Sequence, residues 1–246
     1  MSKKNSEPLQ VFIGTENNQL LPQKVLEYSL KKNSSVLLKI TPLYQTQKRV
    51  GGTNFGFVRF TIPELCNFNG KAIYLDADQI VLDDINKLMS LLNSNKAVGL
   101  VNKPQGYFGK KVVAKHNQTS VMVLNCEKLK HWKSTKIFNN VVPNRAEKNA
   151  NQIFYRDFMT LSWEDKSKIQ AISPYWNHFN IINKNTKLVH FSHVRSQPWK
   201  NVNHELTEFW AIWLKEAIKN KAVSRITVFL EIIKGNVDRY FLRYLF

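Results

Sequence analysis

The chain has 246 residues, of which 43% are hydrophobic. This length fits one large domain, or one domain with an appendage, and the apolar content excludes wholesale disorder. Lysine and arginine number 36 against 18 acidic residues, which gives a formal charge of +18. Such an excess attracts phosphate-bearing partners. No zinc-finger spacing, RNP-type aromatic signature or basic region with heptads accompanies it, so no nucleic-acid partner is expected.

The N-terminus, MSKKNSEPLQ, is polar and lacks the apolar core of a cleaved signal. No apolar stretch approaches the roughly 20 residues that a membrane-spanning helix requires. The two cysteines, Cys66 and Cys126, match no zinc pattern and are expected to be free thiols in a reducing compartment. We therefore expect a cytoplasmic protein whose contact with a membrane, where it occurs, is peripheral.

The first third of the chain alternates apolar strands with a helix. Residues 9–14 (LQVFIG) predict a buried strand, residues 21–32 a helix with Pro22 in its first turn, and residues 36–40 a second strand. This order indicates a β-α-β unit within a mixed or parallel sheet. The glycine-rich residues 51–57 lack the Lys-Ser/Thr ending of a P-loop, so we do not predict that this motif binds a nucleotide.

Shorter elements follow. The patterns predict a helix that begins at Asp83 or Asp84, either of which can cap it. The other expected elements are a helix over 58–66, strands over 71–75, 97–101, 119–125 and 187–192, and helices over 127–138 and 149–161. Together they predict an α/β fold.

The segment 204–246 differs in character from the rest. One helical face gathers the apolar residues Leu206, Phe209, Trp210, Trp213, Leu214, Ala217 and Ile218. A second apolar segment covers 222–233, and the last stripe combines Val237, Tyr240, Phe241, Tyr244 and Leu245 with Arg239 and Arg243. Two interpretations remain open at this point, core packing or a basic, aromatic membrane-surface helix.

The motif IYLDADQIVLDDI, residues 73–85, carries the clearest chemical signal. An apolar strand delivers Asp76 and Asp78 at its end, and a separation of two puts both carboxylates on one side of an extended chain. Two such acids repel each other unless a cation lies between them, and Mg²⁺ or Mn²⁺ prefers oxygen ligands. The ends of strands are also where open α/β sheets place ligands.

A second signal is VHFSHVRSQPWK, residues 189–200. His190 ends a predicted strand, and an imidazole suits Mn²⁺ better than Mg²⁺. Alone, His190 fits a structural histidine better than a ligand, but with the Asp-x-Asp motif it is a candidate third ligand. His193, Arg195 and Lys200 add donors for phosphate oxygens.

These segments, in this order, resemble the family 8 glycosyltransferases, which are retaining enzymes. The resemblance covers about residues 9–200 and rests on LQVFIGTENNQLLPQKVLEYSLKK, VRFTIPEL, IYLDADQIVLDDI, TSVMVLN, Asn151-Gln152 and HFSHVRSQPW. It implies a GT-A, Rossmann-like mixed sheet flanked by helices over residues 1–203, with 204–246 as a helical C-terminal appendage. It also implies a UDP-sugar donor and an acceptor that is a glycan, a glycolipid or a protein.

The resemblance further implies roles for individual residues. Asp76, Asp78 and His190 correspond to the ligands of Mn²⁺, which bridges the donor's diphosphate. The remaining implied contacts are Gly14, Thr15 and Glu16 with the nucleoside, Arg59 with the diphosphate-sugar, Gln118 and Thr119 with the sugar, and Asn151 and Gln152 beside the anomeric carbon.

The chain departs from the family pattern in two places. Asn151 stands where the family usually has aspartate. In the last motif the usual glycine has no counterpart, and Gln197 occupies the place of a phosphate-binding lysine, which leaves Arg195 or Lys200 as substitutes. Two alternatives to a working transferase therefore stay open: a basic protein that binds phosphate or nucleic acid, and a glycosyltransferase-like module that binds donor without turnover.

Overall fold

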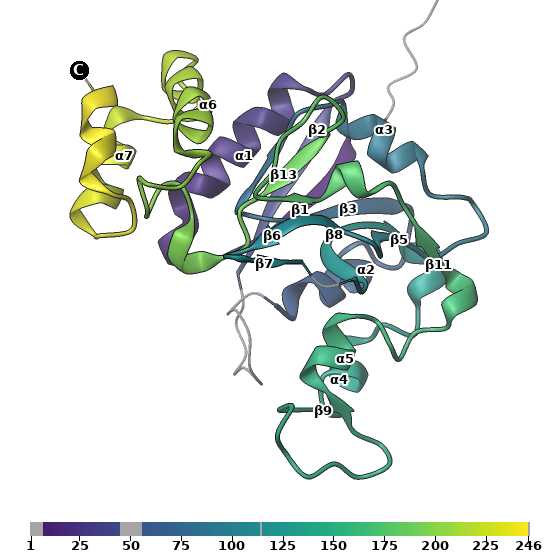
Figure 1. The fold of residues 1–246 in the computed structure, drawn as a ribbon. Coiled ribbons are helices and arrows are strands. Elements are labelled where there is room, and N and C mark those ends of the chain that lie inside the picture. The colour runs from purple at the N-terminus through teal and green to yellow at the C-terminus, as the bar shows by residue number, and fades with distance from the viewer. Residues whose placement is uncertain (1–6, 45–55, 114, 246) are drawn as a thin grey trace, which may run out of the picture.

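The computed structural model describes residues 7–44, 56–113 and 115–245. A six-stranded mixed sheet with the order β11-β5-β8-β3-β1-β2 forms its centre (Figure 1). Its strands are β1 (Leu9–Thr15), β2 (Leu38–Tyr44), β3 (Lys71–Asp76), β5 (Val98–Val101), β8 (Gln118–Asn125) and β11 (Ile169–Ala171). β1 pairs in parallel with both β2 and β3, which confirms the predicted β-α-β unit, and β8 runs antiparallel to β3.

A second sheet has the order β4-β13-β12-β6-β7. Its strands are β4 (Gln79–Val81), β6 (Gln105–Phe108), β7 (Lys111–Val112), β12 (His178–Phe179) and β13 (Leu188–His190). β4 begins three residues after β3 ends and pairs antiparallel with β13. The chain therefore passes from the first sheet to the second between Asp76 and Gln79, and β13 reaches that crossing from more than 100 residues away.

Helices cover both faces of the central sheet. On one face α1 (Leu20–Lys32) and α3 (Ile85–Ser90) pack their apolar side chains against β1 and β3. The opposite face packs against η2 (Val58–Thr61), α2 (Ile62–Leu65), η3 (Cys126–Leu129) and α5 (Tyr155–Met159). This burial on two sides explains why β1, β3 and β8 read as continuous apolar runs rather than alternating ones.

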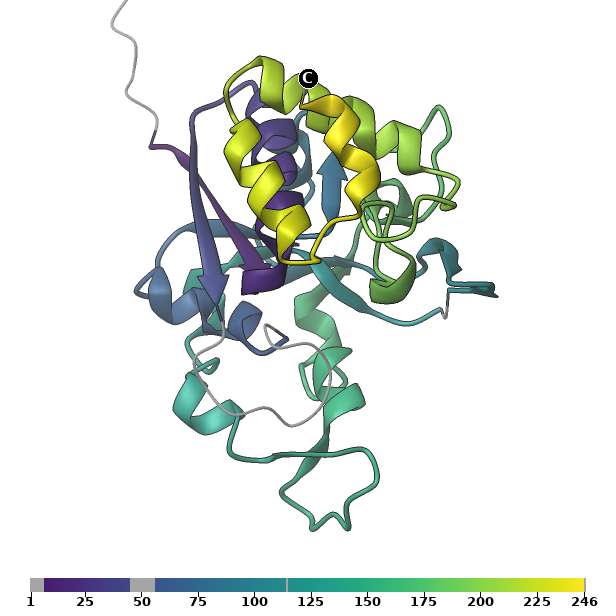
Figure 2. The same ribbon diagram turned by 90° about the vertical axis from the view of Figure 1, so that its left-hand side faces the viewer.

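The C-terminal segment consists of α6 (Thr207–Lys219), α7 (Arg225–Ile233) and the 3₁₀ segment η7 (Arg239–Tyr244). Figure 2 shows these yellow and yellow-green elements in front of the purple helix α1. The ring of Trp210 lies 5.3 Å from that of Trp199 and 5.1 Å from that of Phe241, and all three are buried. The stripes on α6 and η7 therefore pack a third core together with α1 and β13. The division of the chain at residue 203 remains a prediction.

Two predicted helices are wrong. Residues 127–138 form η3 and the short α4 (Ser134–Ile137), because the chain turns between them to let Trp132 donate a hydrogen bond to the buried Glu164. Residues 149–161 are helical only in α5, because Ile153 and Phe154 are drawn into a parallel pair, β9 (Val141–Val142) with β10 (Ile153–Phe154).

The other expected elements occur, with strand ends that differ by a few residues. Asp84 caps α3 by accepting a hydrogen bond from the amide of Asn86, as predicted. The remaining short 3₁₀ segments are η1 (Asn17–Gln19), η4 (Lys166–Lys168), η5 (Pro174–Trp176) and η6 (Val194–Ser196). Residues 51–55 of the glycine-rich loop lie outside the described residues. No helix among the described residues is long and apolar enough to cross a bilayer.

Candidate functional site

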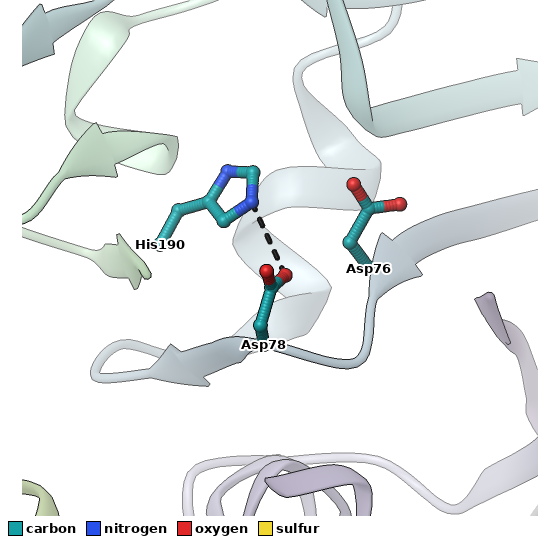
Figure 3. Close-up of side chains that lie close together, drawn as sticks. All are labelled: Asp76, Asp78 and His190. Carbon is teal, nitrogen blue, oxygen red and sulfur yellow. Dashed lines mark ion pairs between the residues drawn. The ribbon is translucent and has the colours of Figure 1, made fainter. Parts of the chain in front are cut away.

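The structure brings Asp76, Asp78 and His190 together at the crossing between the two sheets (Figure 3). Asp76 ends β3 and His190 ends β13, while Asp78 lies in the turn before β4. The amide of Phe191 donates a hydrogen bond to the carbonyl of Asp78 over 2.9 Å, which fixes the two strands beside each other. One ligand atom from each of the three side chains lies within 4.8 Å of the other two.

Asp76 is held by two buried neighbours. Arg59 Nη2 and the Tyr74 hydroxyl both donate to its Oδ1, at 3.0 and 2.6 Å. Burial raises the pKa of Asp76 from its ordinary value, while the Arg59 guanidinium acts in the opposite direction. Since both of these hydrogen bonds go to Oδ1, the second carboxylate oxygen is the one available to a ligand.

Asp78 and His190 are also oriented from behind. Gln197 Nε2 donates to Asp78 Oδ2 over 3.0 Å, and Asn177 Oδ1 lies 3.0 Å from His190 Nδ1. Because an amide oxygen only accepts, Nδ1 carries a proton, as assigned from this hydrogen bond. Asn177 is anchored in turn by its Nδ2, which donates to Ser120 Oγ over 2.9 Å.

The remaining atoms of these side chains fit a divalent cation. His190 Nε2 lies 3.2 Å from Asp78 Oδ1, and this oxygen is buried and accepts no hydrogen bond from the described residues. With its proton on Nδ1, His190 would face a carboxylate with a lone pair, which is unfavourable unless a proton or a metal ion lies between them. Two carboxylates and one imidazole suit Mn²⁺, with Mg²⁺ less favoured by the nitrogen ligand.

The three side chains line a cavity of about 610 Å³. That volume lies in the range of about 300–1,000 Å³ usual for small-molecule sites. Of the predicted donor-site residues, Arg59, Gln118 and Thr119 also line it, and Arg59 Nη1 donates to Thr119 Oγ1 over 3.0 Å. Lys111 and Arg156 line the cavity too, so that its walls carry positive charge beside the two aspartates.

The predicted nucleoside residues lie at the same sheet edge. Gly14 is in register with Asp76, and the amide of Ala77 donates to the carbonyl of Gly14 over 3.0 Å. Thr15 and Glu16 follow directly where β1 ends. The carboxyl ends of β1 and β3 therefore present residues 14–16 and the two aspartates at one edge of the central sheet.

The two candidate replacements for the family lysine differ in position. Arg195 is exposed on η6, whereas Lys200 is half-buried and lies close enough to Glu16 and Asp78 to feel both charges. Burial lowers the pKa of Lys200 from its ordinary value, and the two acids oppose that shift. Of the two candidates, Lys200 is thus the one that lies near charges of the site, those of Glu16 and Asp78.

Asn151 and Gln152 are not among the residues that line the cavity. They lie in the connection between β9 and β10, where Gln152 Oε1 accepts a hydrogen bond from the amide of Asn149 and the Asn151 side chain is exposed. Their assignment to the anomeric carbon remains a prediction.

Sequence reasoning missed three residues that shape the site: Tyr74, Asn177 and the amide role of Gln197. Tyr74 reads as one more apolar residue of a buried strand, and Asn177 stands in no recognisable motif. The sequence shows Gln197 only as the residue in the place of the family lysine. Asn177 and Gln197 act through contacts between separate segments, which no spacing along the chain encodes. Tyr74 lies two residues before Asp76 on the same face of β3, and this spacing is the signal that could have identified it.

Comparisons with known proteins agree with this architecture. The family model "Glycosyl transferase family 8" matches residues 12–203. The chain is 26% identical over 239 residues to "Protein CDI" of Arabidopsis thaliana, an alignment that covers 85% of this chain and 86% of the relative.

Solved structures show the same fold. The galactosyltransferase LgtC in complex with donor and acceptor sugar analogs aligns with a TM-score of 0.62 at 14% identity, over 85% of this chain and 96% of LgtC. The bifunctional glycosyltransferase WbbM aligns with a TM-score of 0.63 at 12% identity, over 87% of this chain and 50% of WbbM, so the chain spans about half the length of that protein. The mixed sheet with flanking helices is thus a GT-A fold, and the chain belongs to glycosyl transferase family 8.

Proposed function

We propose that this glycosyltransferase transfers a hexose from a UDP-sugar to a glycan, glycolipid or protein acceptor, with retention at the anomeric carbon and with Mn²⁺ as its cofactor. The observation that carries the proposal is the buried Asp76–Asp78–His190 cluster in the wall of a cavity of about 610 Å³. These three residues would hold the ion. When bound, the ion supplies positive charge to the donor's diphosphate, as a Lewis acid does for a leaving group.

Two cationic side chains of the protein, Arg59 and Lys200, would also supply positive charge to the diphosphate. Arg59 is fixed by Asp76 and Thr119 and stacks over the Tyr74 ring at 4.7 Å, so its guanidinium is oriented before any ligand binds. Lys200 lies near Glu16 and Asp78. We assign the two of them to the diphosphate, where they would stabilise the negative charge that develops as the sugar–phosphate bond breaks.

The residues that line the cavity, in the part of the chain that the structure describes, favour attack on the anomeric carbon from the face that the leaving group occupies. The carboxylates among them are Asp76 and Asp78, and both belong to the cluster. A double displacement needs a further carboxylate near the sugar as nucleophile. We therefore propose that the acceptor hydroxyl attacks directly and that the departing phosphate oxygen takes its proton. A trapped covalent adduct between sugar and protein would contradict this route.

Asn151 and Gln152 enter this proposal as residues that orient the sugar through their amides. Since neither lines the cavity in this structure, such contact requires the connection between β9 and β10 to lie closer to the cavity when donor is bound. Cross-linking or hydrogen exchange of residues 143–152 with and without UDP and Mn²⁺ tests this part separately.

The experiment for the main proposal has two readouts. Thermal unfolding with UDP, with Mn²⁺ and with both should show a stabilisation that needs both, and this stabilisation should vanish in Asp78→Asn. Nucleotide-sugars are then screened with Mn²⁺ for hydrolysis and transfer. Stabilisation without turnover of any donor would favour the alternative of a binding module. No stabilisation by UDP and Mn²⁺ would contradict the proposal as a whole.

A further inference from the structure

Helix α7 exposes an apolar face. Ile226, Phe229, Leu230 and Ile233 follow one another at i, i+3, i+4 and i+7, the spacing that places side chains on one side of a helix. Their exposed fractions are 71%, 48%, 46% and 66%. The outer face of a surface helix normally carries polar and charged residues, so a continuous apolar stripe there indicates a surface that meets something other than water.

The inner face of α7 is already occupied. Val228 and Glu231 are buried where α7 contacts α1 and η7. The Glu231 carboxylate accepts hydrogen bonds from Lys234 Nζ over 2.9 Å and from Asn236 Nδ2 over 2.8 Å. The helix is therefore held in place by a face opposite the stripe, and the stripe is not required to hold α7 on the protein.

Cations border the stripe. Arg225 flanks it at the start of α7, and Lys219 and Lys221 lie exposed just before the helix, whereas Lys234 at the other end pairs with Glu231. From Lys219 to Gly235 the one acidic residue is Glu231, which is buried and paired. An apolar face bordered by lysine and arginine is the pattern of a helix that lies in the plane of a bilayer surface.

We propose that α7 docks the protein on an anionic lipid bilayer, with Ile226, Phe229, Leu230 and Ile233 between the lipid headgroups and the cations Lys219, Lys221 and Arg225 against anionic lipid phosphates. This surface differs from the one that the sequence suggested, because the aromatic stripes of α6 and η7 pack inside the protein. The inference does not depend on the reaction proposed above, since it uses no residue of the candidate site.

Charge and size favour a bilayer over a protein partner. A second copy of this chain would bring the same three cations against the stripe's borders, and the chain already carries a net charge of +18. A helix of nine residues is only about 13 Å long, and its four exposed apolar residues are few beside the roughly 20–30 residues per side of a standard protein interface. A bilayer surface sets no such minimum, and it supplies both the apolar layer and the negative charge.

The test is cosedimentation of the full chain with vesicles of phosphatidylcholine alone and of phosphatidylcholine with phosphatidylglycerol. The wild type should bind the anionic vesicles, and high salt should weaken the binding. The variant I226S/F229S/L230S/I233S should lose at least about tenfold in affinity. The variant K221Q/R225Q should lose about tenfold as well, since each cation near an anionic surface contributes severalfold.

Two controls guard the interpretation. Leu37→Ser with Leu65→Ser removes exposed apolar side chains elsewhere, of 77% and 54% exposure, and should leave vesicle binding unchanged. Circular dichroism and UDP-dependent stabilisation report whether each variant is folded.

Each other outcome overturns the proposal. Failure of the wild type to bind anionic vesicles removes the bilayer as the occupant. Equal binding by wild type and the four-serine variant assigns the attraction to net charge rather than to α7. A wild-type dimer that becomes a monomer in the four-serine variant, with no vesicle binding by either, assigns the stripe to a second copy of the chain.

Discussion

Gln197 donates one hydrogen bond to Asp78 Oδ2 over 3.0 Å and shares the same Nε2 with the carbonyl of Phe191 at 3.1 Å. The residue that replaces the family's phosphate-binding lysine thus holds a candidate metal ligand. The Gln197 side chain is 1% exposed, so water does not compete with it as the donor to Asp78. Its amide ties the Asp-x-Asp turn to the segment after β13, and through it to His190.

We predict that Gln197→Leu lowers the affinity for Mn²⁺ by about 10- to 100-fold, the usual effect of removing a residue that orients a ligand. Titration with Mn²⁺ followed by electron paramagnetic resonance measures the free ion directly. Gln23→Leu is the matched control, because Gln23 is equally buried but donates to Glu27 within α1. An unchanged Mn²⁺ affinity in Gln197→Leu would show that Gln197 contributes to packing and does not orient Asp78.

Asn177 permits a comparable test at the histidine. Asn177→Leu removes the acceptor for His190 Nδ1 and should weaken Mn²⁺ binding by a similar factor. Asn177→Asp keeps an oxygen at that place, and Ser120 Oγ can donate to it, so binding should be restored to within a few-fold of wild type. Equal loss in both variants would show that the site needs the shape of Asn177 rather than its acceptor.

The loop before α3 should make stability depend on pH through Asp83. Partial burial opposes the shift, but hydrogen bonds from Lys87 and Lys187 lower the pKa of Asp83 to about 2. A pKa below that of the unfolded chain stabilises the fold above about pH 4, and this contribution is lost as the pH falls towards 2.

Asp83→Asn should therefore lower the free energy of unfolding by about 1 kcal/mol at neutral pH, after allowance for solvent screening. Urea unfolding of both proteins at several pH values measures the difference, which should shrink below about pH 4. A difference that stays constant down to pH 3 would assign the effect to lost packing instead of charge.

The C-terminal segment should contribute strongly to stability. Trp210 is 1% exposed between Trp199 and Phe241, so Trp210→Ala should cost about 3–5 kcal/mol in urea unfolding. Ile212→Ala, two residues further on and on the solvent side of α6, should change stability by no more than about 0.5 kcal/mol. Similar values for the two variants would mean that α6 packs loosely and that the third core adds little.

Strong local patterns made much of the fold predictable. The apolar strands over 9–14, 71–75 and 119–125 are buried on both sides, so continuous apolar runs identified them. The Asp-x-Asp turn was visible because the strand before it ends abruptly. The prediction of helices over 127–138 and 149–161 was wrong because other contacts determine the local structure there. Trp132 donates a hydrogen bond to Glu164, and β10 pairs with β9.

By itself, then, the sequence determined the strand–helix–strand core, the placing of Asp76 and Asp78 at the edge of the sheet, and the kinship carried by its motifs. Only the tertiary structure decided that β4 and β13 pair, which moves His190 beside Asp78, and that Gln197 and Asn177 orient the two ligands. It also decided which face of each C-terminal helix is buried. The physical reason is the separation along the chain over which each interaction acts. Periodicity and capping act within a few residues, whereas these contacts join segments that only the packing of the two sheets and the three cores brings together.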